Sequence, residues 1–225
     1  FEGYEELAEF DWDGYRDRYG DIQRLDRILE AEGDTPNRYK VSKQADVLML
    51  FYLLSETELE GLLTRLGHSW DPDLIARNTD YYLARTSHGS TLSRVVHSWV
   101  HAREDRTASW QFFQDAVRSD IEDIQGGTTA EGIHLGAMAG SVDLVQRCYP
   151  GLETRAGVLR LDPGIPDELG SLEFAVRYRG TWVTVEITPE RVILMVAPGP
   201  LKAIRVAVGT EEFDLAPGIR REIPN

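Results

Sequence analysis

The stretch ARTSHGSTLSRVV, residues 84–96, joins a loop rich in hydroxyl groups to the start of a regular helix. The apolar side chains that follow the loop recur at helical spacing: Leu92, Val95, Val96, Trp99 and Val100. This spacing predicts an amphipathic α-helix with one apolar face. The residues before Leu92 are therefore expected at a helix N-terminus, where unpaired backbone N–H groups and the positive end of the helix dipole favour an anion.

The loop before this helix has more polar groups than helix capping requires. One hydroxyl is enough for an N-cap. This loop contains Ser87, His88, Gly89, Ser90, Thr91 and Ser93. Glycine has no side chain, so a ligand could come close to the backbone at that position. From these residues alone, both a plain N-cap and an anion site remain open.

Length and composition limit the class of protein. The 225 residues suit one large domain or two small ones, and 42% apolar residues are enough for a packed core. A net charge of −14 argues against nucleic acid or an anionic membrane as the main partner. No apolar run approaches the ~20 residues of a membrane span. Cys148 is the single cysteine, so no internal disulfide can form, and we expect a cytoplasmic protein.

Residues before Pro150 show helical patterns. The segment 45–54 is apolar all round and is expected to be buried on every side. Ser55 and Glu58 have the spacing of a capping box, and so do Thr128 and Glu131. Asp71-Pro72 predicts an N-cap followed by proline at the first helical position. The small residues of 132–140 suggest a helix packed closely against a neighbour.

After Gly157 the apolar period becomes two. Alternation over 172–178, 183–187 and 204–208 predicts strands, with a further apolar run at 192–196 and turns between them. We therefore expect an α+β chain, with a helical domain over 1–156 and a small antiparallel β-sandwich over 157–225.

Three stretches resemble one known family. They are KVSKQADVLML at 40–50, YYLARTSHGSTLS at 81–93 and TTAEGIHLGAMAG at 128–140. Their order, spacing and wording are similar to the C-terminal part of the maltose, trehalose and kojibiose phosphorylases of glycoside hydrolase family sixty-five. The resemblance implies the C-terminal half of an (α/α)6-barrel catalytic domain, followed by a β-sandwich of jelly-roll type.

The resemblance also implies a reaction: inverting phosphorolysis of an α-glucosidic bond, which yields β-glucose 1-phosphate. Inorganic phosphate is then the co-substrate, and no cofactor is expected. An inverting hydrolase needs one carboxylic acid for the leaving oxygen and a second carboxylate to activate water. Phosphate is already an anionic nucleophile and needs hydrogen-bond donors instead. The loop 86–93 has such donors and no acidic side chain, which favours the anion site.

By this resemblance, specific residues receive roles. The expected phosphate ligands are His88, Gly89, Ser90 and Thr91, where the family usually has His-Gly-Ser-Ser. The expected ligands of the transferred glucose are Lys43 and Gln44, and Glu131 is a further candidate that could orient a substrate group. Lysine offers three donors and glutamine both donor and acceptor, which suits sugar hydroxyls. Glu131 also fits the capping box, so both of its roles stay open.

Other polar residues are interpreted as structural. Glu131 and His134, three residues apart, are expected on one face of one helix. His97 and His101 have the spacing of a zinc-binding helix but lack the glutamate that follows the first histidine in such motifs, so we expect surface histidines and no metal. The five tryptophans are expected mainly in the core, with Trp70 the least certain.

The chain is also expected to be incomplete. It begins with Phe1, and the general acid of the family, a glutamate, lies in a motif upstream of Lys43 that has no match here. We therefore predict that this chain alone is inactive and that it dimerises or binds its missing N-terminal part. Two alternatives stay open: a hydrolase of the same family acting on trehalose or a related disaccharide, and a non-catalytic carbohydrate-binding or structural module.

Overall fold

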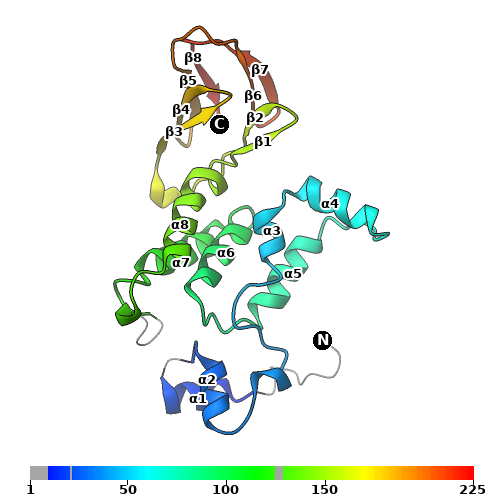
Figure 1. Cartoon of the computed structure of the whole chain (residues 1–225), viewed down its shortest axis with the longest axis vertical. Coiled ribbons are helices and arrows are strands. Elements are labelled where there is room, and N and C mark those ends of the chain that lie inside the picture. The colour runs from blue at the N-terminus through cyan, green and yellow to red at the C-terminus, as the bar shows by residue number, and fades with distance from the viewer. Residues whose placement is uncertain (1–9, 21, 125–128) are drawn as a thin grey trace. The chain divides into compact units, whose positions relative to one another are not determined.

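The computed structural model describes residues 10–20, 22–124 and 129–225. The chain forms two compact units. Unit 1 comprises Phe1–His101 and Ala108–Ser141, and unit 2 comprises Ala102–Thr107 and Val142–Asn225. Figure 1 shows helices in the first part of the chain and strands in the last. Helices followed by antiparallel-rich sheets confirm the predicted α+β class.

Short helices make up the first part of the chain. In chain order they are α1 (Trp12–Tyr19), α2 (Leu25–Ala31), the 3-10 helix η2 (Pro36–Arg38), α3 (Met49–Leu53), α4 (Glu56–Arg65), α5 (Leu74–Leu83), α6 (Thr91–His101), α7 (Arg106–Arg118), the 3-10 helix η3 (Thr129–Glu131) and α8 (Leu135–Asp143). No helix among the described residues has the length and apolar character needed to cross a membrane.

Local capping explains where two helices begin. The predicted capping box of α4 is confirmed: the Ser55 hydroxyl accepts from the Glu58 amide, and the Glu58 carboxylate accepts from the Ser55 amide. The start of α5 was predicted wrongly. Asp71 accepts from the Asp73 amide at 3.0 Å and closes a turn containing Pro72, so the helix begins only at Leu74.

The prediction that 45–54 is buried on every side is wrong. Only Met49–Leu53 is α-helical, and Leu50 and Leu53 are 45% and 64% exposed. The buried side of the segment, at Ala45 and Leu48, packs with Val96 and Val100 of α6. Within unit 1 the segment therefore has a neighbour on one side, and the other side stays open.

Helix α6 is the central element of unit 1, and it is buried nearly all round. Besides its apolar face, Ser93, Arg94, His97, Ser98 and His101 are buried. The amphipathic interpretation, with His97 and His101 at the surface, is therefore wrong. The polar face of α6 lies against α7, where the Ser98 and Ser109 hydroxyls each donate to the other residue's carbonyl oxygen, at 2.9 and 2.7 Å.

The region around 129–143 differs from the predicted single helix. The 3-10 helix η3 ends at Glu131 and α8 begins at Leu135, so Glu131 and His134 do not share one helical face. His134 instead pairs with the Asp120 carboxylate. Close helix packing is confirmed at Gly140, where an added Cβ would lie 2.6 Å from Val95 Cγ1 of α6. Thr128 and the Glu131 side chain lie outside the described residues.

Two four-stranded sheets form most of unit 2. Their strands are β1 (Glu153–Arg155), β2 (Val158–Leu161), β3 (Leu172–Tyr178), β4 (Thr181–Ile187), β5 (Arg191–Val196), β6 (Ile204–Val208), β7 (Glu211–Leu215) and β8 (Arg220–Pro224). The orders are β1-β2-β6-β7 and β3-β4-β5-β8. Every pairing is antiparallel except β2 with β6, which is parallel. Strand structure begins at Glu153, before the change of period at Gly157.

The alternating pattern decides which side chains of unit 2 are buried. On β4 the inward positions Val183, Val185 and Ile187 are fully buried. Trp182 occupies an outward position of β4 and is 54% exposed, so the expectation of a core tryptophan is wrong there. Successive side chains of a strand point to opposite faces, so Trp182 lies on the face opposite Val183.

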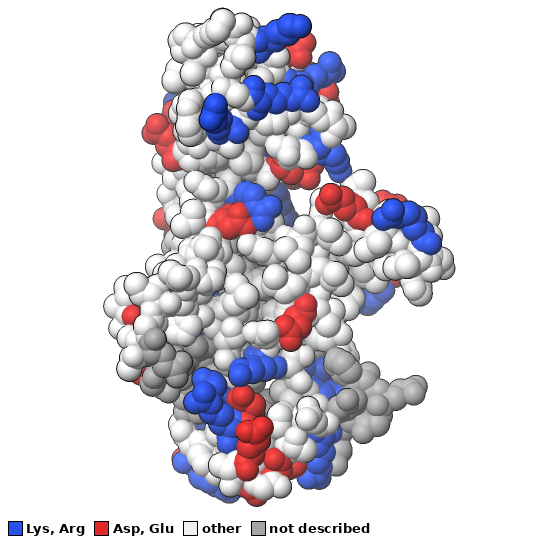
Figure 2. All heavy atoms as spheres, in the orientation of Figure 1, with Lys and Arg blue, Asp and Glu red and all other residues white. Residues whose placement is uncertain are grey.

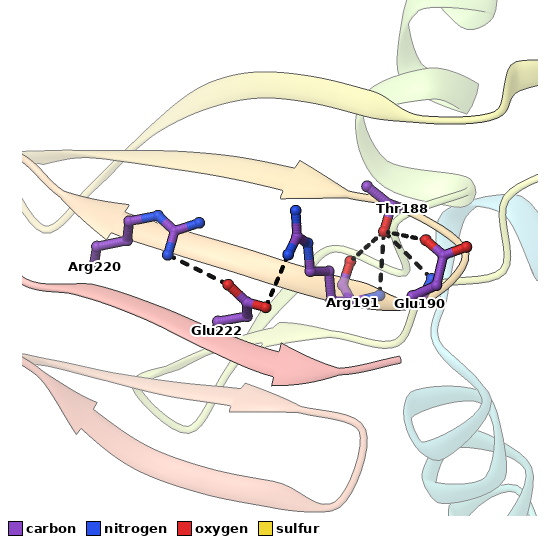
Figure 3. A network of polar contacts seen from close by, with 5 residues as sticks. All are labelled: Thr188, Glu190, Arg191, Arg220 and Glu222. Atoms are coloured by element: carbon purple, nitrogen blue, oxygen red, sulfur yellow. Dashed lines mark hydrogen bonds and ion pairs between the residues drawn. The ribbon is translucent and has the colours of Figure 1, made fainter.

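Charged side chains form ion pairs at the edge of the second sheet. Figure 3 shows Glu222 of β8 receiving hydrogen bonds from Arg191 and Arg220, at 3.1 and 3.4 Å, while Thr188 contacts Glu190 in the β4–β5 turn. Arg191, Glu190, Glu222 and Pro224 also line a shallow surface hollow. Because these charges already pair with each other and are exposed, each pair contributes at most about 1 kcal/mol.

Candidate functional site

Two of the predicted binding segments lie side by side in unit 1. The Ser42 amide donates to the Arg85 carbonyl at 2.7 Å, and the Ser87 amide donates to the Ser42 carbonyl at 2.9 Å. These bonds form a parallel bridge between Ser42 and Thr86. The Lys-Gln segment and the hydroxyl-rich loop are thus joined through their backbones immediately before the residues expected to bind ligands.

The next bond extends this junction into the loop itself. The Gly89 amide donates to the Lys43 carbonyl at 2.8 Å. An added Cβ at Gly89 would lie 2.7 Å from the Gln23 carbonyl oxygen and 3.1 Å from Lys43 Cγ. The close approach expected of a ligand at this glycine is therefore made by the chain's own residues. Its amide is used internally, so the remaining loop groups must supply the donors for an anion.

His88 adopts an unusual backbone conformation at the centre of the loop. Its φ of 55° lies in the left-handed region, which costs on the order of 1 kcal/mol for a residue other than glycine. Its Nδ1 lies 3.0 Å from the Ser93 hydroxyl, inside the first turn of α6. Strain of this kind persists where the surrounding structure enforces it, and it is frequent at functional sites.

The electrostatics around His88 come from burial and from one arginine. Burial first, and then the charge of Arg94, lower the pKa of His88 to about 4. Arg94 is 5% exposed and donates to the Gln23 side-chain oxygen at 2.6 Å. Its Nε lies 3.9 Å from Asp115 Oδ2. His88 is therefore neutral at pH 7, and the positive charge next to it belongs to Arg94.

Arg94 is a candidate that the sequence did not reveal. An amphipathic helix places an arginine between Ser93 and Val95 in solvent, on the polar face. In the structure that face is buried, so the guanidinium lies inside unit 1, beside the N-terminus of α6. The buried position of Arg94 follows only from the tertiary contacts of α6, because the sequence pattern of the helix assigns this arginine to the surface.

The hydroxyl groups of the loop lie at the start of α6. The Ser90 carbonyl accepts from the Ser93 amide at 3.0 Å, and the helix begins at Thr91. Ser90 is half-buried, whereas Thr91 is only 4% exposed. The structure therefore brings His88, Ser90 and the first turn of α6 together, with Thr91 buried at the start of the helix.

Lys43 and Gln44 are held by acidic neighbours. Lys43 Nζ lies 3.2 Å from Asp26 Oδ2 at the start of α2. Partial burial opposes ionisation of Asp26, but the hydrogen bond and charge of Lys43 keep the pKa of its carboxyl below the usual value. The Gln44 side-chain amide donates to Asp46 at 2.8 Å. Asp26 is thus a further member of the site that sequence reasoning missed.

The polar groups of the candidate site are hydrogen-bond donors and positively charged side chains. Among the residues that the structure describes, no three His, Cys, Asp or Glu side chains are grouped closely enough to hold a metal ion. Figure 2 shows acidic and basic side chains interspersed over the visible face. The candidate site instead combines a helix N-terminus, hydroxyl groups, Lys43 and the buried Arg94, a set that suits an anion and a polyhydroxylated ligand.

Comparison with known proteins assigns both parts of the chain to one family. A model described as "Glycosyl hydrolase family 65 central catalytic domain" matches residues 1–143. A second, described as "Glycosyl hydrolase family 65, C-terminal domain", matches residues 152–215. Together they place the helical part and the strand-rich part in separate domains of the same family.

Individual relatives agree with these matches. An uncharacterised glycosyl hydrolase of Mycobacterium tuberculosis is 59% identical over 92% of the chain and 16% of its own length. The trehalose 6-phosphate phosphorylase of Lactococcus lactis is 41% identical over 85% of the chain and 25% of its own length. The chain thus spans about a quarter or less of these relatives.

A solved structure shows the same fold. A human-microbiome protein described as a kojibiose phosphorylase matches with a TM-score of 0.68 at 24% identity, covering 84% of this chain and 23% of that one. At this identity the likeness concerns the fold alone. The domain matches, which cover more than half of the chain, show that it belongs to glycosyl hydrolase family 65.

Proposed function

We propose that this chain forms part of an inverting phosphorylase that cleaves the α-glucosidic bond of a disaccharide with inorganic phosphate. The observation that carries the proposal is the backbone junction of Ser42 with Thr86 and of Lys43 with Gly89. It joins the segment with donors suited to sugar hydroxyls to the loop suited to an anion. A phosphorylase requires these two ligands next to each other, because phosphate oxygen must attack the anomeric carbon of the bound glucose.

The proposed chemistry follows from this arrangement. Phosphate, held by His88, Ser90, Thr91 and the N-terminus of α6, attacks C1 of the glucose from the face opposite the α-linkage. The C1–oxygen bond to the second sugar breaks, and the product is β-glucose 1-phosphate. No carboxylate base is needed in the loop, since phosphate is already anionic. Arg94 stabilises the phosphate charge from beneath the loop.

The departing sugar needs a proton, and we assign this role to a glutamic acid supplied by polypeptide outside this chain. Loss of general-acid help alone typically costs 10²–10⁴-fold in rate. The open side of the α3 segment, with Leu50 and Leu53 exposed, is consistent with a catalytic domain that continues beyond these residues. The chain alone is therefore expected to bind ligands without turning them over.

The names of the relatives indicate which substrate to test first. The chain is 41% identical to a trehalose 6-phosphate phosphorylase, and it is 30% identical to the α,α-trehalose phosphorylase of Thermoanaerobacter brockii. We therefore propose a trehalose-type disaccharide, with the phosphorylated form as the leading candidate. Kojibiose is the second substrate, because a kojibiose phosphorylase of Halothermothrix orenii is 27% identical over 85% of the chain.

Calorimetric titration of the chain with inorganic phosphate and with glucose tests the proposal. We expect both ligands to bind, and phosphate binding to be lost in His88→Ala and retained in His68→Ala. Sugar binding without phosphate binding would favour a hydrolase of the same family. Sugar binding confined to residues 157–225 would favour a carbohydrate-binding module. Release of β-glucose 1-phosphate by the chain alone, as a monomer, would overturn the assignment of the acid to other polypeptide.

A further inference from the structure

Three histidine rings and one phenylalanine ring form a compact ring stack next to the anion loop, and Phe112 contacts all three histidines. The His88 and His97 ring centroids are 4.8 Å apart with an interplanar angle of 65°, an edge-to-face contact. The His97 and Phe112 rings stack at 5.2 Å and 26°. His101 stacks on Phe112 at 5.7 Å and 9°. The stack lies between α6 and α7 and ends, on the loop side, at His88.

His97 occupies this stack without a hydrogen bond to any residue that the structure describes. The residue is 0% exposed, and neither ring nitrogen has a hydrogen-bond partner among the described residues. Burying a polar group without a partner is unfavourable. Hydrogen bonding therefore does not explain a histidine here. What the structure uses is the flat five-membered ring, which meets the His88 ring edge-to-face and stacks on Phe112. The His88 and Phe112 rings also contact each other, with centroids 5.6 Å apart.

The His97 ring is also electrically neutral. Burial, and then the charges of His88 and His101, lower the pKa of His97 to about 3. It therefore adds no charge next to the loop at pH 7. An aromatic ring in edge-to-face contact restrains its neighbour and stabilises the pair beyond the effect of the area that it buries. The strained backbone of His88 makes such a restraint useful, because it fixes a side chain whose main chain is held at a φ of 55°.

We propose that His97 is a positioning residue that supports the His88 imidazole from below and so sets the geometry of the anion loop. The proposal rests on the proposed function for the identity of the anion as phosphate. The contact between the His97 and His88 rings does not depend on the proposed function. It assigns His97 an effect on phosphate affinity through His88, without contact to phosphate. Sugar binding at Lys43 should not depend on His97.

The test compares His97→Leu, which removes the flat ring, with His97→Phe, which keeps it. The matched control is His101→Leu, the same change one helical turn further from His88. Circular dichroism first checks that each variant is folded. We expect the dissociation constant for inorganic phosphate to rise at least tenfold in His97→Leu, to stay within about threefold in His97→Phe and within about twofold in His101→Leu. The affinity for glucose should be unchanged in all three.

A spectroscopic measurement separates this inference from the proposed function. The ring ¹⁵N and ¹H resonances of His88, assigned with His88→Ala, should move in His97→Leu and stay close to wild type in His101→Leu. Failure of the wild type to bind phosphate would refute the proposed function, while these resonances would still test the contact. Unchanged His88 resonances in His97→Leu, or equal losses of affinity in His97→Leu and His101→Leu, would overturn the inference. If His97→Leu does not fold, loss of phosphate binding in a folded His97→Phe would overturn it.

Discussion

The Gly89 amide donates a hydrogen bond to the Lys43 carbonyl oxygen at 2.8 Å, which joins the two segments that we propose bind phosphate and sugar. The bond fixes the backbone positions of Gly89 and Lys43 relative to each other. The Lys43 side chain lies over Gly89 and ends at the carboxylate of Asp26. A change at Gly89 itself should therefore reach Lys43, and the first prediction concerns this contact.

Replacing Gly89 with alanine should damage both ligand sites. The added Cβ would lie 2.7 Å from the Gln23 carbonyl oxygen, a backbone atom that cannot move without shifting its own segment. Overpacking of this kind typically costs about 1–3 kcal/mol. We expect a loss of stability of that size in urea unfolding, together with weaker binding of both phosphate and glucose.

The matched control is Gly61→Ala in α4, where an added Cβ meets nothing within 4 Å. Alanine is favoured over glycine in a helix interior by about 1 kcal/mol. This variant should therefore be slightly more stable than wild type and bind phosphate normally. A Gly89→Ala protein as stable as Gly61→Ala would contradict the packing described here.

Asp26→Asn should weaken sugar binding more than phosphate binding. The carboxylate holds Lys43 Nζ at 3.2 Å, and asparagine keeps the shape of the side chain but removes its charge. Lys43 would then sample other rotamers, and we expect glucose affinity to fall about three- to tenfold, an entropic cost of ordering a long side chain. Titration with each ligand separately measures the two effects. An equal loss for phosphate and glucose would show that Asp26 supports the whole site.

The protein should lose stability as the pH falls below about 6.5. Burial, with nearby charges, lowers the pKa values of His88 and His97 to about 4 and 3 in the folded state, below the unfolded value of 6.5. Between these values the unfolded chain binds more protons than the folded one, so acidification favours unfolding. The contribution of these histidines is complete above pH 6.5 and is lost as the pH falls toward 3.

Urea unfolding at pH 7.5 and pH 5 measures this effect. A difference of one pKa unit between the folded and unfolded states corresponds to about 1.4 kcal/mol. The decline should be smaller in His97→Phe, which removes one of the two groups. A decline of the same size in wild type and His97→Phe would show that His97 is not held neutral by burial.

In unit 2, buried and outward positions should behave differently. Leu194→Ala removes a fully buried side chain of β5 and should destabilise unit 2 by about 2–5 kcal/mol. Trp182→Ser on the outward face of β4 should change stability by less than about 1 kcal/mol. Neither should alter phosphate affinity, because the anion loop belongs to unit 1. Thermal unfolding and phosphate titration check both expectations, and reduced phosphate affinity in a folded Trp182→Ser would contradict them.

Local patterns predicted those features of the fold that depend on local interactions. The capping box at Ser55 needs only residues within one turn, and the alternation over 172–178 depends on one face of one strand. The helix after Ser90 begins where its hydroxyl residues suggested. Each of these features is decided by neighbours in the sequence, which is why the sequence is sufficient for them.

Features that depend on contacts between residues far apart in the sequence were not predicted, or were predicted wrongly. The polar face of α6 is buried because α7 covers it with matching hydroxyls, so His97 and Arg94 are internal although their spacing assigned them to the surface. The parallel pairing of β2 with β6 joins strands far apart in the chain. For the candidate site, the family resemblance indicated the loop and the Lys-Gln segment, and the structure places these two segments side by side. Asp26 could be identified only from the structure, because its contact with Lys43 joins residues far apart in the sequence.

The central claim is that the loop from His88 to Thr91 binds phosphate. A crystal structure of the chain soaked with inorganic phosphate tests it most directly. We predict the anion at the N-terminus of α6, contacting the His88 ring, the Ser90 hydroxyl and free backbone amides of the first turn, with Arg94 beneath it. An empty loop at saturating phosphate, with the Ser90 hydroxyl folded back as a plain N-cap, would contradict the claim.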